Sequence, residues 1–462
     1  MKKVLLAGAA LMLVSGIAST ASAAAVEPGV KITGDARVRA WYMSEEYGGT
    51  FGNDDRYDSK TDMDSRVRVN IAGTAAGGAY AKVRLRVMEG LMGDSDKDTV
   101  PFSDSNSNLW ADQAYVGIPF TDQFTLEIGK YRSTYGPLGT TYNFAYDDVN
   151  LTGFRGIVKM GDVEINPFVE WMEEAQSDTT TDDDKYADND EMRFGAHVKA
   201  KLNKDWTLGG MLGYQTDARD GVVDSFEANE GFFGTLYANG KSGQFGLVGE
   251  FAVTDGDLNG MNSWLNDGSG KEFYTLDSKT GAAKLNTDID EIGSDDTGFG
   301  GYVFPNYQID KLNIGLNLGF TDGGFVPDRA FGFVMVGSSD NSKITDYMIG
   351  KGGDWMWGGL VTSYQISESL KLTGNIVYAE IDAWTEEGEG PRGAWAASNP
   401  TKLEDNDLAL DSAWELSAVL QYTISKGADV YFSAGYLSPE FADSDLEDDA
   451  AFGALTRFEL KF

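Results

Sequence analysis

The sequence predicts an all-β protein, a transmembrane up-and-down antiparallel β-barrel whose strands are joined by hairpins. Three observations carry this prediction. Apolar and polar residues alternate with a period of two over most of the chain, the connections between these segments are short and long in turn, and the chain ends on an alternating segment, ALTRFELKF. Because a closed barrel gives each strand a neighbour on both edges, the final strand would also have two partners.

The first 23 residues are predicted to be a secretory signal peptide that is cleaved after Ala23. Lys2 and Lys3 form a charged start, residues 4–14 form a short apolar core, and Ala21-Ser22-Ala23 fits a small-residue cleavage site. The apolar core is too short to serve as a membrane-spanning anchor. The sequence therefore divides into a signal peptide, residues 1–23, and the expected barrel, residues 24–462.

Several segments read as strands with one apolar and one polar face. The apolar positions are Leu312, Ile314, Leu316, Leu318 and Phe320 in KLNIGLNLGF; Trp414, Leu416, Ala418, Leu420, Tyr422 and Ile424 in WELSAVLQYTI; and Ala454, Thr456, Phe458, Leu460 and Phe462 in the last segment, where Arg457, Glu459 and Lys461 take the other face. Two early segments, SRVRVNI and AKVRLRVM, alternate valine, leucine and isoleucine with arginine and lysine. A shift of one residue would put arginines in the apolar layer, so this pattern fixes the strand register.

The connections predict eighteen strands. Short turns are expected at residues 75–78, 119–122, 161–162, 203–205, 240–243, near Asp310, at 367–369 and at 426–428. Longer polar loops are expected near residues 44–61, 91–106, 134–149, 173–189, 217–229, 255–297, 321–353, 383–411 and 438–450. Strict alternation of short and long connections puts both chain ends on one side of a barrel. Sixteen strands remain an alternative, since the segments 232–239 and 298–309 alternate weakly.

A water-soluble β-sandwich has the same one-dimensional pattern, so periodicity alone does not separate the two folds. Eighteen hairpin-linked strands exceed what an open twisted sheet usually holds. The alternation of connection lengths has no role in a sandwich, and aromatic residues gather near strand ends, as in the two girdles of a membrane barrel. Pro167 and Pro305 oppose the prediction because both fall inside expected strands, where a closed barrel has no free edge.

Composition excludes several classes of protein. The chain has 73 acidic and 37 basic residues and a formal charge of −36, so nucleic acid is not an expected partner. It has no cysteine and a single histidine, His197, which rules out cysteine nucleophiles and histidine-based metal clusters. No G-x-S-x-G motif occurs. We therefore expect no enzymatic activity, no cofactor and no metal site.

The residues expected to matter for function are charged side chains on the inner faces of the early strands. A barrel of sixteen to eighteen strands is wide enough to hold a water-filled channel, whose selectivity is set by the charges along it. The basic candidates, on adjacent strands and therefore on one wall, are Arg37, Arg39, Arg66, Arg68, Lys82, Arg84 and Arg86, with Arg155 further along. The acidic candidates, expected to face them across the channel, are Asp112, Glu127, Asp147 and Asp148. The alternative is a solvated wall with no special role.

The stretch LWADQAYVGIPFTDQFTLEIGKYRSTYGPLG resembles the Gram-negative outer-membrane porins. The resemblance is carried by Ala114, Tyr115, Gly117, Ile118, Gly129 and Lys130, which match an AYxGL-like strand, a short turn, and a strand that ends in Gly-Lys before the third extracellular loop. The terminal Phe462, with Leu460 and Phe458, is similar to the signal that the barrel-assembly machinery reads in that family. The family's third loop narrows the channel; the matching segment here, Thr134–Asn150, is short and lacks the family's Pro-Glu-Phe-Gly motif.

The function predicted from the barrel and the resemblance is passive conduction of small hydrophilic solutes or ions across the outer membrane. The expected partners are outer-membrane lipid and lipopolysaccharide, the permeating solutes and the assembly machinery, and the resemblance adds a homotrimer. Three alternatives stay open: a channel selective for one class of solute such as organic anions, a non-conducting structural or adhesive surface barrel, and a secreted β-protein. Conductance separates the first two from each other, and recovery in the membrane fraction excludes the third.

Overall fold

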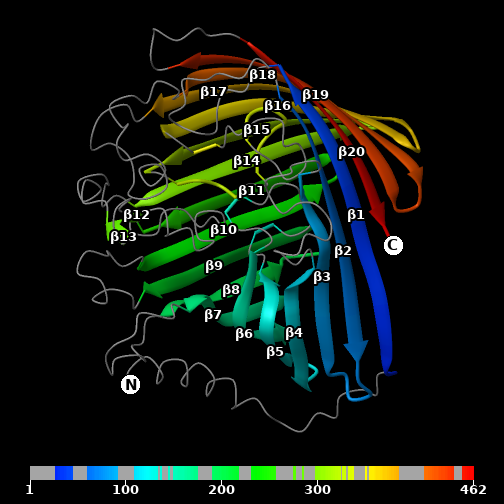
Figure 1. Cartoon of the computed structure of the whole chain (residues 1–462), viewed down its shortest axis with the longest axis vertical. Coiled ribbons are helices and arrows are strands. Elements are labelled where there is room, and N and C mark those ends of the chain that lie inside the picture. Colours follow the sequence, from blue (N-terminus) through cyan, green and yellow to red (C-terminus); the bar gives the residue numbers. More distant parts are fainter. Residues whose placement is uncertain are drawn as a thin grey trace.

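The computed structural model (Figure 1) contains a single large sheet and no helix among the residues that it describes. Those residues are 27–44, 60–91, 109–133, 136–137, 144–145, 149–174, 190–217, 230–255, 274–276, 283–285, 297–323, 325–328, 331–337, 349–350, 353–383, 410–441 and 450–462. Within these ranges, no helix is long and apolar enough to cross a membrane.

Eighteen strands form the sheet. They are β1 (Gly29–Met43), β2 (Lys60–Thr74), β3 (Tyr80–Leu91), β4 (Trp110–Thr121), β5 (Phe124–Ser133), β6 (Val149–Met160), β7 (Val163–Glu174), β8 (Asp190–Lys201), β9 (Trp206–Asp217), β10 (Gly231–Ser242), β11 (Phe245–Thr254), β14 (Gly298–Ile309), β15 (Leu312–Asp322), β16 (Gly353–Ser367), β17 (Leu370–Ala383), β18 (Leu410–Ser425), β19 (Ala428–Phe441) and β20 (Ala451–Lys461). A separate hairpin, which the sequence pattern did not predict, is formed by β12 (Tyr274–Leu276) and β13 (Ala283–Leu285) within the connection from β11 to β14.

Each strand of the large sheet pairs antiparallel with its neighbours in sequence, and the sheet closes on itself. The first and last strands, β1 and β20, pair from Asp35 with Lys461 to Met43 with Gly453. Beyond this ladder, the Gly34 and Phe462 backbones exchange two hydrogen bonds, with N···O distances of 2.8 and 3.0 Å. Figure 1 shows the C-terminus beside β1 at the seam. The prediction that the final strand has a partner on both edges is therefore confirmed.

The eighteen-strand prediction is confirmed, and the sixteen-strand alternative is wrong, since β10 and β14 are both full members of the sheet. Short and long connections alternate along the chain as expected. Eight connections of two to five residues join strands at one end of the barrel, for example Met160 to Val163 and Ser425 to Ala428. The predicted long loops join the strands at the other end, and most of their residues lie outside the described ranges.

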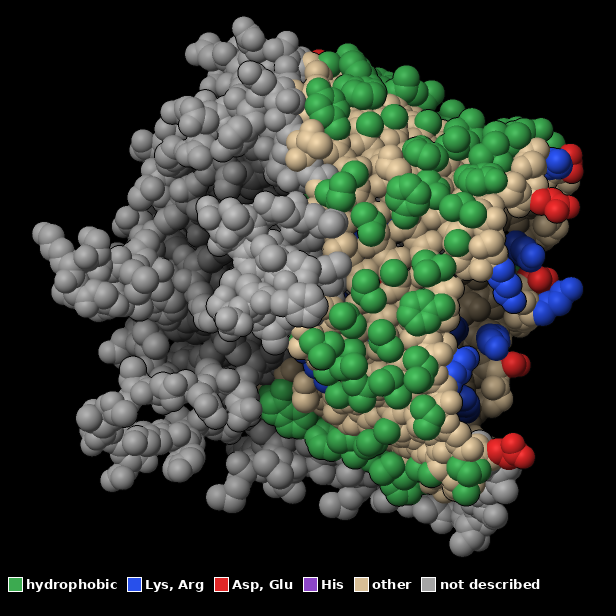
Figure 2. All heavy atoms as spheres, turned by 45° about the vertical axis from the view of Figure 1, so that its right-hand side comes forward, with side chains coloured by type: hydrophobic (Ala, Val, Ile, Leu, Met, Phe, Trp, Pro, Cys, Tyr) green, Lys and Arg blue, Asp and Glu red, His purple; other side chains and the backbone are tan. Residues whose placement is uncertain are grey.

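The apolar faces of the strands point outward. Leu316, Leu318 and Phe320 of β15 are exposed, whereas Asn317 between them is buried. The same holds at the end of the chain, where Phe458, Leu460 and Phe462 are exposed and Arg457 is buried. Figure 2 shows hydrophobic side chains spread over the outer surface of the barrel, with charged side chains gathered at one rim. An apolar exterior and a polar interior are what a barrel in a lipid bilayer requires.

Pro167 and Pro305 do lie inside strands, and the structure shows how the barrel accommodates them. Each proline keeps its pairing with one neighbouring strand, Pro167 with Ala196 and Pro305 with Leu247. On the other side the ladder is interrupted for two residues and then resumes in the same register. Since proline has no N–H to donate, the cost is a local loss of pairing rather than a bulge.

Candidate functional site on the inner face of the barrel

The inner faces of the adjacent strands β20, β1, β2 and β3, and of β6 beyond β4 and β5, carry a group of basic side chains, which we call the arginine wall. Its members are Arg457, Arg37, Arg39, Arg66, Arg68, Lys82, Arg84, Arg86 and Arg155. The strand alternation that puts valine and phenylalanine on the outside puts these residues on the inside. Their side chains are buried or half-buried within the barrel, and Arg39 is among the most deeply buried side chains in the described residues.

The register of the strands places several of these cations directly opposite one another. Arg37 pairs with Arg66 across β1 and β2, Arg39 with Arg457 across β1 and β20, and Arg68 with Arg86 across β2 and β3. Like charges at directly opposed positions destabilise a sheet. The same register also sets a carboxylate residue opposite three of these cations: Glu459 opposite Arg37, Asp64 opposite Arg39 and Asp35 opposite Arg68.

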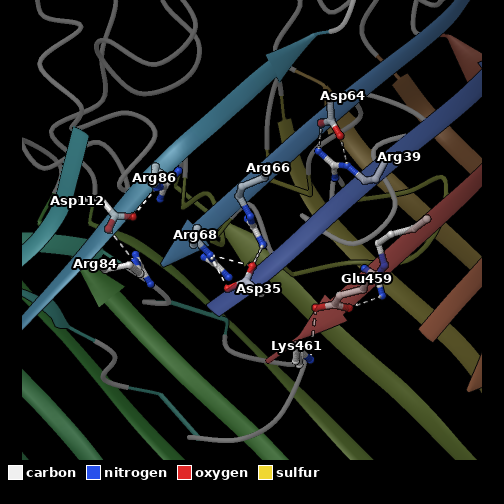
Figure 3. Close-up of polar contacts among 11 residues, drawn as sticks. Asp35, Arg39, Asp64, Arg66, Arg68, Arg84, Arg86, Asp112, Glu459 and Lys461 are labelled. Atoms are coloured by element: carbon white, nitrogen blue, oxygen red, sulfur yellow. Dashed lines mark hydrogen bonds and ion pairs between the residues drawn. The ribbon is translucent and has the colours of Figure 1, made fainter. Parts of the chain in front are cut away.

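Carboxylates interleaved with the cations offset part of this repulsion. Asp64 accepts hydrogen bonds from the Arg39 Nε, at 2.9 Å, and from its Nη2. Asp35 accepts from the Arg68 Nε at 3.0 Å and lies 3.8 Å from an Arg66 nitrogen. Figure 3 shows Asp64 of β2 joined to Arg39 of β1, and Asp35 of β1 joined to Arg66 and Arg68 of β2. Charge-assisted contacts of this kind are shorter and stronger than neutral hydrogen bonds.

Asp112 reaches the wall because of a β-bulge in β4. Arg84 of β3 pairs with Gln113 and the next residue, Leu85, pairs with Ala111, so that Asp112 has no partner in β3. Bulges re-aim side chains, and here the bulge turns Asp112 inward, where it is buried. Its two oxygens accept separate hydrogen bonds, one from the Arg84 Nε at 2.7 Å and one from the Arg86 Nε. One carboxylate therefore joins two cations (Figure 3).

A second carboxylate, Glu127 of β5, lies at the other end of the group. It accepts hydrogen bonds from the Arg155 Nε at 3.0 Å and from the Tyr80 hydroxyl at 2.6 Å. The Arg155 guanidinium also lies 4.4 Å from the centre of the Tyr131 ring, within the range of a cation–π contact. These contacts hold the side chains of β3, β5 and β6 in fixed positions.

The structure corrects the expected arrangement of the acidic residues. Asp112 and Glu127 do not face the cations across the barrel but lie within the same wall, hydrogen-bonded to Arg84, Arg86 and Arg155. Since β4 and β5 adjoin β3 and β6, adjacency in the sheet puts them beside the cations instead of opposite. Asp147 and Asp148, the other two expected members, lie outside the described residues.

Four members of this group were not among the residues singled out from the sequence. Arg457 and Glu459 come from the last strand, and their nitrogen and oxygen atoms are 3.9 Å apart. Asp35 and Asp64 come from the first two strands. The alternation pattern placed Arg457 and Glu459 on the polar face of their strand, but only the closure of β20 onto β1 brings them beside Arg37 and Arg39. In the group as described, nine basic residues accompany five carboxylates.

Two loop segments fold inside the barrel and pack against its other half. The first is Phe144 with Ala145; the second, which we call the inner segment, comprises the described residues 325–328, 331–337 and 349–350 between β15 and β16. They are joined directly, because the Asp328 N–H donates a 2.7 Å hydrogen bond to the Phe144 carbonyl. The resemblance implied that the family's third loop, which matches the connection after β5, narrows the channel; the participation of the later loop was not predicted.

An aromatic cluster joins these segments to the strands of that half. The Phe144 ring lies 4.9 Å from the ring of Phe331, 5.3 Å from Phe325, 5.7 Å from Tyr302 of β14 and 6.2 Å from Trp357 of β16. All five side chains are almost completely buried. Burial of large aromatic side chains is the main source of stability in such a contact. The inner segment is therefore a packed part of the fold, in contact with strands that include β14, β16 and β19.

His197 lies on the inner face of β8, where it is buried. Its Nε2 is 3.0 Å from the Tyr237 hydroxyl, and the two rings stack at 5.9 Å. Among the described residues, no group of three or more acidic, histidine or cysteine side chains is placed to hold a metal ion.

Comparison with known proteins gives one family. The family model described as Gram-negative porin matches residues 7–383. The structure of Pseudomonas aeruginosa OprD matches 96% of this chain and 98% of its own, at 12% sequence identity and a TM-score of 0.50. The structure of OccD1 (OprD) with two substitutions matches 96% of this chain and 99% of its own, at 10% identity and a TM-score of 0.51. The outer membrane channel DcaP of Acinetobacter baumannii matches 96% of this chain and 100% of its own, at 11% identity and a TM-score of 0.42. No curated protein sequence matches the chain.

Proposed function

Because the chain belongs to the Gram-negative porin family, and is thus a passive channel of the outer membrane, we propose that its solutes cross the barrel beside the arginine wall and that the wall favours anions. The family match over most of the chain disfavours a non-conducting structural or adhesive barrel. No enzymatic activity and no cofactor form part of the proposal.

The observation that carries the proposal is the set of three opposed arginine pairs on one continuous stretch of the inner face. The sheet tolerates Arg37 against Arg66, Arg39 against Arg457 and Arg68 against Arg86, although each pair costs stability. With nine basic residues and five carboxylates, the group retains a surplus of positive charge. Rings and rows of charged side chains along a pore select ions of the opposite sign.

The inner segment supports the same path. It packs on the strands of the other half of the barrel, through Tyr302, Trp357 and the cluster around Phe144, and so narrows the interior on that side. A solute is then left to pass near the arginines. Alternating cations and carboxylates along one side of a passage also orient polar solutes and disfavour apolar ones, since an apolar solute replaces none of the hydration of these charges.

The test compares reversal potentials of the mature protein and of the double variant Arg84→Ala/Arg86→Ala in planar bilayers with a salt gradient. The interaction energy between a unit charge on the wall and a monovalent ion about 7 Å away is about 0.6 kcal/mol in water, and about half of that at 0.1 M salt. Because anion and cation respond with opposite sign, loss of two cations lowers the anion-to-cation permeability ratio by about sevenfold. The control is Lys204→Ala, which removes an exposed cation at a turn away from the wall. An unchanged ratio in the double variant would exclude the wall as the selective element.

The proposal also covers the assembly of the protein. Removal of residues 1–23 after export, recognition of the terminal Phe462 by the barrel-assembly machinery, contact of the outer rim with lipopolysaccharide, and a homotrimer are all consistent with the family. Exposure of Phe462 beside the β1–β20 seam supports its role as a recognition residue. Mass measurement of the purified protein tests the cleavage site, and its size in mild detergent tests the trimer.

A further inference from the structure

The buried carboxylates of the barrel that are not part of the arginine wall include two that bind backbone rather than cations. Glu415 of β18 accepts hydrogen bonds from three consecutive N–H groups of the inner segment: Val334 at 3.0 Å, Met335 at 3.0 Å and Val336 at 2.7 Å. Its side chain is 1% exposed. Three successive amides of the inner segment thus converge on one carboxyl group of the strand.

Glu250 of β11 plays a matching part for the other inward loop. It accepts hydrogen bonds from the Phe144 N–H at 2.8 Å and the Ala145 N–H at 3.3 Å, and from the Thr235 hydroxyl at 2.7 Å. Its side chain is 3% exposed. Because the Asp328 N–H binds the Phe144 carbonyl, the two loops are anchored as one body at two points of the barrel, on β11 and on β18.

The strands also provide space for the side chains of the inner segment. A Cβ added at Gly435 of β19 would lie 2.4 Å from the Met335 Cγ, and one added at Gly359 of β16 would lie 2.8 Å from the Phe333 ring. Glycine at these two inward positions lets the loop approach the strands more closely than any other residue would allow. The carboxylate anchors and these glycine sockets together form an interface built to seat the loop.

We propose that Glu415 is the positioning residue that holds the inner segment against the strands and thereby sets the width of the passage beside the arginine wall. This rests on the proposed function, because it assigns the segment the role of constriction. Glu415 is well suited to this role, because its two carboxyl oxygens accept hydrogen bonds from three successive N–H groups of the segment, and a bond to a buried donor is costly to lose. The surrounding aromatic contacts confer packing but do not satisfy these donors.

The proposal is tested by single-channel recording of Glu415→Gln, with Glu440→Gln as the matched control. Glu440 is an exposed residue of β19 that accepts a hydrogen bond from Ser412 at 2.7 Å. Glutamine offers one acceptor oxygen where Glu415 offers two, and the loss of hydrogen bonds to buried donors is expected to raise the fraction of time spent in a higher conductance level by about a hundredfold. Because a wider passage weakens the field of the wall, the anion preference falls as the conductance rises. The control variant keeps the conductance and selectivity of the wild type.

A disulfide separates release of the segment from a general disturbance of the barrel. The chain has no cysteine, so Met335→Cys with Gly435→Cys introduces a single pair at a site where the added Cβ would already touch residue 335. In the Glu415→Gln background, oxidation restores the narrow conductance level and reduction removes it. A conductance in Glu415→Gln equal to that of the wild type, or an increase that the disulfide does not reverse, would overturn the proposal.

If Glu415→Gln does not yield a folded, heat-modifiable barrel, Gly435→Leu supplies an independent perturbation. The larger side chain occupies the Met335 socket, leaves Glu415 in place, and is expected to displace the segment and raise the conductance in the same way. No increase in a folded Gly435→Leu variant would also overturn the proposal. A wild-type protein without any conductance would instead contradict the proposed function itself, which distinguishes the two failures.

Discussion

Replacing Asp112 with asparagine removes the carboxylate that two arginines share. Asp112 accepts from the Arg84 Nε at 2.7 Å and from the Arg86 Nε, and the three side chains are 6%, 7% and 17% exposed. Loss of one partner of a fully buried ion pair costs several kcal/mol. Here asparagine keeps one acceptor oxygen and the guanidinium groups can regain water from the channel, so we expect a loss of about 2 kcal/mol in the free energy of unfolding.

The same substitution adds one positive charge to the wall. Each unit of charge about 7 Å from the ion changes the anion-to-cation permeability ratio by about threefold at 0.1 M salt. Asp112→Asn should therefore raise the anion preference by about threefold, whereas Arg84→Ala/Arg86→Ala lowers it. Both variants weaken the hydrogen bonds of the same three-residue cluster, but they shift the anion preference in opposite directions.

Two measurements on each variant check this prediction. Urea unfolding from lipid vesicles, followed by tryptophan fluorescence, gives the change in stability, and the reversal potential in a salt gradient gives the permeability ratio. The expected result is lower stability in both variants with selectivity shifted in opposite directions. A lower anion preference in Asp112→Asn would refute the reasoning, because the cluster would then act through its structure and not through its net charge.

Two further substitutions test other parts of the fold. Gly129→Ala is expected to lower the free energy of unfolding by about 3 kcal/mol, because Gly129 has a φ of 121° and an added Cβ would lie 2.4 Å from the Ala114 carbonyl oxygen. The control is Gly73→Ala, which should leave the unfolding midpoint unchanged because an added Cβ there meets no atom within 4 Å. Equal midpoints for the two variants would contradict this prediction. Phe462→Ala keeps the backbone bonds to Gly34 but removes the terminal aromatic ring, so we expect less heat-modifiable protein in the outer membrane at unchanged conductance of refolded protein; a normal membrane yield would argue against Phe462 as a recognition residue.

Most of the barrel follows from local patterns. The period-two alternation and the turn residues predict the number of strands, the eight short turns and the outward direction of faces such as Leu316–Phe320, because each depends on residues close together in the chain. The prolines show the limit of this reasoning. A closed barrel offers Pro167 and Pro305 no free edge, yet the ladder skips two residues on one side and continues.

The site was harder to predict, because its contacts join residues distant in sequence. Alternation placed Arg84 and Arg86 on the inner face, but the bulge that puts Asp112 between them depends on how β3 pairs with β4. The sequence pattern predicts only a polar loop where the inner segment lies. Its run FGFVMVG, Phe331–Gly337, is unusually apolar for an exposed loop, and this signal could have indicated burial. Glu415, which accepts hydrogen bonds from this run, lies on the polar face of its strand, and no neighbouring residue in the sequence marks its role.

The central claim is that this barrel is a channel whose selectivity is set by the arginine wall. The most direct test is planar-bilayer recording of the purified mature protein, with the reversal potential taken in a KCl gradient. Stepwise, ohmic conductance with a reversal potential of the sign that marks anion preference is the predicted result. Absence of steps from folded, heat-modifiable protein would contradict the channel, and steps with a cation preference would contradict control by the wall.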